Sequence, residues 1–206
     1  MKNLAIVLAA CCLASAALAF DEPAIIPQPQ SLERAEGAFR LTPNLVIATD
    51  AASKDAAKFL AERLRTATGY GIKTVLRKET SQTFRGNVII LTAENARADL
   101  DAEGYELNVT PGVVTINAPA QAGLFYGAQT LLQLLPAEIL SGKVVKNFDW
   151  EIPCVKISDA PRFSWRGLML DVSRHFFPRN EIEQLLDAMA LCRARTLARA
   201  FTSPTP

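Results

Sequence analysis

Hydrophobic and polar positions along the chain predict short strands and two helices between residues 22 and 140. Helices are expected over 51–68 and 121–135, where apolar side chains recur every three or four residues. Strands are expected where apolar residues alternate with polar ones or run without interruption, which covers 31–41, 45–50, 71–77 and 87–93. The predicted order is two strands, a helix, four strands and a second helix.

The clearest local signal is a hairpin over residues 104–118. Tyr105, Leu107 and Val109 alternate with polar residues, Pro111-Gly112 suits the turn, and alternation resumes on the return. Hairpins with helices between them predict an α+β class. We expect a small, mostly antiparallel sheet that carries both helices on one face.

A second unit is expected after this domain. Residues 141–163 are interpreted as a linker, with a strand-like piece over 152–157 and Trp150 as an anchor. SWRGLMLDVS then predicts a new strand. The next helix begins near Pro178, and its expected buried face is Ile182, Leu185, Leu186 and Met189. A strand followed by a helix over 164–191 is a first βα unit of a further domain.

Composition narrows the function classes. Half of the 206 residues are hydrophobic, and the net charge is +1, which gives no reason to expect nucleic acid as a partner. The single histidine, His175, excludes sites that need two, and without a cysteine cluster no zinc site is expected. The prediction is that the chain holds no metal and no cofactor. Cys154 is interpreted as a buried apolar residue, and whether it pairs with Cys192 is left open.

The first 19 residues predict a secretory signal peptide, because one lysine precedes an apolar stretch and Ala17-Leu18-Ala19 suits cleavage. The alternative is lipid attachment at Cys11. The stretch is short and rich in alanine, so no transmembrane span is expected. We therefore expect an exported protein, periplasmic or secreted.

Two long segments resemble a known family. IPCVKISDAPRFSWRGLMLDVSRHFFPRNEIEQLLDAMAL resembles the entry into the catalytic barrel of glycoside hydrolase family 20, the bacterial-type β-N-acetylhexosaminidases. The upstream EGYELNVTPGVVTINAPAQAGLFYGAQTLLQLLP resembles the small α+β domain that precedes that barrel. The resemblance implies a (β/α)8 barrel that removes terminal N-acetylhexosamine from β-linked glycans. It also implies substrate-assisted, retaining hydrolysis, in which an adjacent Asp-Glu pair assists the substrate's own acetamido group.

The resemblance also suggests site residues. Arg166, at the start of the first barrel strand, is expected to donate hydrogen bonds to hydroxyls of the terminal sugar. The alternative is an ion pair with Asp171 or Asp159. Asp171 and His175 are expected to lie behind the groups that contact the sugar. Arg174 is expected to belong to a buried hydrogen-bond and ion-pair network at the floor of the pocket. Ser173, His175 and Asp171 lie along one line and cannot form a nucleophilic triad.

The end of the chain departs from the family pattern. Residues 192–206 do not resemble a second barrel strand, and residues 140–206 contain no adjacent Asp-Glu pair. We interpret this tail as aberrant, as a frameshift after about Leu191 would produce. The barrel is then incomplete, the chain inactive, and the region after residue 160 loosely held or prone to aggregation. The alternative function is a non-catalytic scaffold or a weak carbohydrate- or protein-binding module.

Overall fold

The computed structural model describes residues 23–77 and 87–200. The predicted signal peptide and residues 201–206 lie outside this part. The elements in chain order are β1 (Ser31–Arg40), β2 (Val46–Thr49), α2 (Lys54–Thr68), β3 (Lys73–Leu76), β4 (Val88–Thr92), β5 (Tyr105–Val109), β6 (Val113–Asn117), α3 (Gln121–Leu134), the 3-10 turn η1 (Ala137–Leu140), β7 (Glu151–Asp159), β8 (Gly167–Asp171), α4 (Arg179–Leu191) and β9 (Thr196–Ala200).

The first domain is built on a seven-stranded sheet in the order β1-β7-β5-β6-β4-β2-β3. The α+β class is confirmed, but the sheet is mixed rather than mostly antiparallel. The strands β1, β7, β5 and β6 pair antiparallel, while β6, β4, β2 and β3 pair parallel. Alternation located the strands and the hairpin, but it carries no information about the direction of partners that are distant in sequence.

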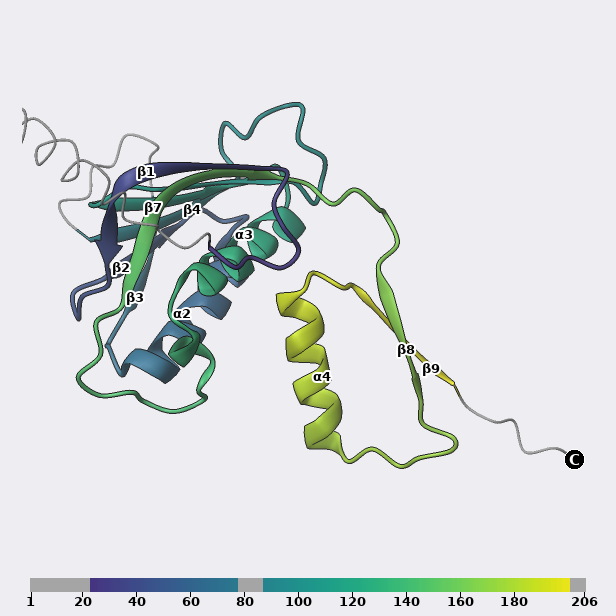
Figure 1. Cartoon of the computed structure of the whole chain (residues 1–206). Coiled ribbons are helices and arrows are strands. Elements are labelled where there is room, and N and C mark those ends of the chain that lie inside the picture. The colour runs from purple at the N-terminus through teal and green to yellow at the C-terminus, as the bar shows by residue number, and fades with distance from the viewer. Residues whose placement is uncertain (1–22, 78–86, 201–206) are drawn as a thin grey trace, which may run out of the picture.

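Both predicted helices form and lie on the same face of the sheet (Figure 1). Gly69 ends α2 in the left-handed conformation, with φ 71°. The small residues of α3 let it approach the sheet closely. A Cβ added at Gly123 would lie 2.1 Å from the carbonyl oxygen of Gly104. The largest fully buried side chains of the core include Phe39, Leu45, Leu60, Ile89, Tyr105, Leu107 and Ile116.

A buried polar cluster fixes the start of α2. One carboxylate oxygen of Asp50 accepts hydrogen bonds from the backbone N–H and hydroxyl of Ser53, at 2.8 and 2.7 Å. The other accepts from the hydroxyl of Thr92 and the backbone N–H of Ala93, at 2.9 and 2.7 Å. Burial raises the pKa of Asp50, but these four donors outweigh it and hold the pKa below its usual value.

The expected linker over 141–163 is wrong in its second half. Strand β7 lies between β1 and β5, inside the sheet, so the first domain continues to Asp159. Trp150 is 1% exposed, and its ring centroid lies 4.7 Å from that of Phe148. The predicted anchor role of Trp150 is therefore confirmed. Cys154, on the same strand, is buried as expected, and Cys154 and Cys192 are both free thiols.

The second unit is a parallel β8-α4-β9 arrangement that lies beside the first domain (Figure 1). Strand β9 corrects the expectation for the tail, because Thr196–Ala200 pairs with all of β8. Thr196, Leu197 and Ala198 therefore form part of a strand, although arginines flank them in the sequence. Among the four residues expected on the buried face of α4, only Met189 is buried. Ile182 and Leu185 are partly exposed, and Leu186 is exposed.

Candidate functional site

Polar side chains gather at the carboxyl end of β8. One oxygen of Asp171 accepts from the backbone N–H groups of Ser173 and Arg174, at 3.0 and 3.2 Å. The other oxygen accepts from Nε of Arg174 at 2.5 Å. The hydrogen bond from Arg174 is the main reason that the pKa of Asp171 lies below its usual value. The guanidinium of Arg174 remains exposed, so it can reach a ligand at this end of the strand.

His175 follows this group and is exposed. Asp171 is half-buried and oriented by its neighbours, and its supporting role behind the groups that contact the sugar stays a prediction. Arg174 does pair with Asp171, but its side chain is exposed, so the expected buried network at this position is wrong. Within residues 23–77 and 87–200, no cluster of histidine, cysteine and acidic side chains could hold a metal ion.

Arg166 lies at the opposite, amino-terminal end of β8, and its guanidinium contacts other residues of the protein. It donates to a carboxylate oxygen of Glu103 at 3.0 Å, to the hydroxyl of Tyr126 at 3.0 Å and to two backbone carbonyls. Burial lowers the pKa of the guanidinium, but Glu103 and Tyr126 outweigh it, so the pKa lies above its usual value.

These contacts bear on the predicted sugar contact of Arg166. The alternative weighed from sequence was an ion pair, and an ion pair is present, although the partner is Glu103 rather than Asp171 or Asp159. In (β/α)8 enzymes the substrate site lies at the carboxyl ends of the strands, whereas Arg166 precedes its strand. A sugar contact by Arg166 stays a prediction, and the geometry weighs against it.

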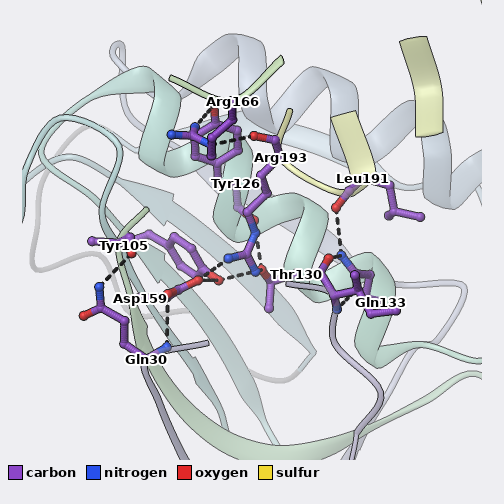
Figure 2. A network of polar contacts seen from close by, with 11 residues as sticks. Gln30, Tyr105, Tyr126, Thr130, Gln133, Asp159, Arg166, Leu191 and Arg193 are labelled. Carbon is purple, nitrogen blue, oxygen red and sulfur yellow. Dashed lines mark hydrogen bonds and ion pairs between the residues drawn. The ribbon is translucent and has the colours of Figure 1, made fainter. Parts of the chain in front are cut away.

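Sequence reasoning missed Arg193, which makes the most buried ion pair among the described residues. Its guanidinium pairs with Asp159 and donates to the hydroxyl of Thr130 at 2.7 Å, and it lies over the ring of Tyr105 (Figure 2). The side chains of Arg193 and Asp159 are only 6% and 5% exposed. Arg193 lies in the segment that the sequence pattern had marked as aberrant, and its partners are distant in sequence.

The comparisons with known proteins divide the chain at the same place as the structure. Residues 22–160 match the family described as Glycosyl hydrolase family 20, domain 2. Residues 163–200 match Glycosyl hydrolase family 20, catalytic domain. The chain belongs to glycosyl hydrolase family 20. The resemblance inferred from sequence is thereby confirmed, and the catalytic-domain match of this family 20 chain continues through β9, beyond Leu191.

Relatives of this family 20 chain are considerably longer. A β-hexosaminidase of Porphyromonas gingivalis is 38% identical over 168 residues, which are 81% of this chain and 21% of the relative. A β-hexosaminidase of Akkermansia muciniphila is 36% identical over 57% of this chain and 22% of its own length. The chain therefore spans about a fifth of the curated relatives it matches.

Solved structures of the family share the fold. The family 20 β-N-acetylhexosaminidase of Streptomyces coelicolor superposes with a TM-score of 0.72 and 36% identity, over 85% of this chain and 34% of that one. A mutant Streptomyces plicatus β-hexosaminidase in complex with its product GlcNAc superposes with a TM-score of 0.74 and 34% identity, with the same coverage.

Proposed function

We propose that this chain is the amino-terminal part of an exported β-N-acetylhexosaminidase, which removes terminal N-acetylhexosamine from β-linked glycans. One observation carries the proposal: a family 20 domain 2 is followed directly by the β8-α4-β9 start of a family 20 barrel, in that order. Relatives of the chain are named β-hexosaminidases, and one similar solved structure holds GlcNAc. An exported location follows from the predicted signal peptide.

The proposed reaction retains the configuration of the sugar without an enzyme nucleophile. The acetamido oxygen of the substrate forms a bond to the anomeric carbon as the bond to the leaving oxygen breaks, and an acidic residue protonates that oxygen. Water then opens the cyclic intermediate. The adjacent Asp-Glu pair that this chemistry needs does not occur in residues 140–206, so we expect the 206-residue chain alone to be inactive.

The part of the site that this chain would contribute is the carboxyl end of β8. Arg174 is exposed there and is aimed by Asp171, so its remaining N–H groups suit a pair of sugar hydroxyls. Arg166 would act at the other end of the strand, through its contacts with Glu103 and Tyr126.

Hydrolysis of a chromogenic N-acetyl-β-glucosaminide tests this proposal. The 206-residue chain is compared with a chimaera in which the barrel of the Porphyromonas gingivalis relative continues after residue 200, so that β9 and Arg193 are kept. We expect activity in the chimaera alone. In that background, Arg174→Ala should lower kcat/KM about 10- to 100-fold, as for a lost charged hydrogen bond. An inactive but folded chimaera would contradict the proposed activity. A larger loss with Arg166→Ala, at unchanged stability, would restore Arg166 as the sugar contact.

A further inference from the structure

Two arginines of the βα unit reach into the first domain at neighbouring places (Figure 2), and a third, the more exposed Arg195, also pairs with Glu103. Arg193 pairs with Asp159 at the end of β7, and Arg166 pairs with Glu103 just before β5. The two are joined to each other, because Nε of Arg166 donates to the backbone carbonyl of Arg193 at 2.9 Å. The βα unit thus presents one two-pronged basic feature to a matching pair of acidic residues.

The acceptor for Arg193 is assembled from first-domain residues. The hydroxyls of Tyr105 and Thr130 lie 2.6 Å apart, and Tyr105 also donates to Asp159 at 3.2 Å. The second carboxylate oxygen of Asp159 accepts from the backbone N–H of Gln30 at 3.1 Å. These groups come from β5, α3, β7 and the segment before β1, so the acceptor belongs wholly to the first domain.

Apolar contact between the two parts is slight by comparison. Met189 is the only residue of α4 that is buried. Another polar link joins them on the surface, where Arg63 of α2 pairs with Asp187 of α4, but both side chains are substantially exposed. An exposed pair contributes little, whereas a buried guanidinium cannot lose its carboxylate without a large penalty. The buried pair is thus the strongest candidate for holding the unit in place.

The backbone at Arg193 supports the same conclusion independently. The N–H of Arg193 donates to Ala190 at 3.1 Å, and the N–H of Ala194 donates to Met189 at 2.8 Å. This is the Schellman ending of a helix, whose left-handed residue is usually glycine. Here that residue is Arg193, with φ 59°. A left-handed arginine is disfavoured and persists only where its surroundings hold it.

We propose that Arg193 is the docking residue that fixes the start of the barrel on the first domain, with Arg166 as its reinforcement. The ion pair to Asp159 and the bond to Thr130 hold the disfavoured backbone at the end of α4. That backbone directs the chain into β9, and β9 pairs along the whole of β8. The first domain therefore sets the position of β8 chiefly through Arg193, with Arg166 as a second contact. This inference does not depend on the proposed catalytic activity.

Hydrogen–deuterium exchange of the whole 206-residue chain tests the proposal, using Arg193→Gly. Glycine relieves the disfavoured backbone, so the helix ending is preserved while the ion pair is lost. We expect amides of β8 and β9 to exchange about 100-fold faster or more, as for the loss of a partner in a buried pair. Amides of β2 and β4, far from Asp159 in the sheet, should exchange as in the unmodified chain.

Two further variants complete the experiment. Arg63→Ala removes the exposed link between the same two parts and should raise exchange by no more than about fivefold. Arg193→Lys retains the positive charge but lacks the planar guanidinium that contacts Asp159 and Thr130 together. It should therefore show part of the protection that Arg193→Gly loses. The proposal is overturned if Arg193→Gly exchanges like Arg63→Ala. It is also overturned if β2 and β4 lose protection equally, since Arg193 would then support the first domain instead of docking the unit.

Discussion

The two tryptophans of the chain stand in its two regions and differ in almost every respect. Trp150, at the end of the first domain, is 1% exposed and packs on Phe148. Trp165, just before β8, is 70% exposed. The strands of the two regions differ in the same way. Strands β4 and β5 of the first domain bury most of their apolar side chains, whereas β8 leaves Met169 largely exposed. One region completes a core with its own residues, and the other is held by polar contacts at one side.

The largest expected effect is a loss of stability in the first domain. Trp150→Ala leaves a large cavity beside Phe148, so it should lower the free energy of unfolding by about 3–5 kcal/mol. Trp165→Ala is the matched control and should change it by less than about 0.5 kcal/mol. Urea unfolding followed by circular dichroism measures both. Equal losses would mean that Trp165 is buried in solution and that the contrast between the regions is false.

The next effect tests how closely the first domain is packed. Gly123→Ala gains helix propensity, but its Cβ would lie 2.1 Å from the carbonyl oxygen of Gly104 and 2.8 Å from Cβ of Ala118. The carbonyl of Gly104 is backbone, so the clash can be relieved only if α3 moves away from the sheet. We therefore expect the free energy of unfolding to fall by about 1–3 kcal/mol. Gly71→Ala, which meets nothing within 4 Å, is the control. Urea midpoints distinguish the two, and a stabilised Gly123→Ala would contradict the packing of α3.

The same contrast explains what could be predicted from the sequence. Within the first domain, alternation and helical periodicity located α2, α3 and the β5-β6 hairpin, because each element buries one face in a core made locally. The parallel pairings were missed, because β2 and β4 meet through tertiary structure that no local pattern encodes. The strand-like piece at 152–157 was found, yet its place inside the sheet depends on β1 and β5, which are distant in sequence.

The candidate site was harder to predict for a physical reason. The segment that contains Arg166 and Arg174 was recognised from its motif, but a motif does not say which end of the strand each arginine occupies relative to a partner domain. Arg193 was missed because its role requires Asp159, Thr130 and Tyr105 to come together from three elements. An arginine where a helix would normally end in glycine was the one local signal, and it is visible only once the helix end is known.

A smaller effect concerns pH and again separates the two regions. The pKa of Asp50 lies below the unfolded value of about 3.9, so its stabilising contribution is present above that pH and is lost as pH falls through the folded pKa. Asp50→Asn should therefore cost about 1–2 kcal/mol at pH 7, and the cost should shrink toward pH 2.5. Urea midpoints across that range measure this.

Asp171 is the control for the pH experiment, since its pKa is lowered as well but it lies in the βα unit. Asp171→Asn should leave the acid dependence of first-domain unfolding unchanged. A cost for Asp50→Asn that stays constant as pH falls would show that the carboxylate charge is not what the four donors stabilise. The cost of Asp50→Asn would then come from the changed shape and hydrogen bonding of the side chain.

The smallest effect on stability is expected at Met169, and this variant tests the exposed apolar surface of the βα unit. Met169 is 71% exposed on β8, a strand that pairs with β9 alone among the described strands. Apolar surface beside an unpaired strand edge favours association between chains. Met169→Lys should thus slow aggregation, measured by light scattering, while the free energy of unfolding changes by less than about 0.5 kcal/mol. Gln184→Lys, at an exposed position of α4, adds the same charge without removing apolar surface. If it slows aggregation equally, net charge rather than the exposed face of β8 drives association, and the two regions differ less in solution than their burial indicates.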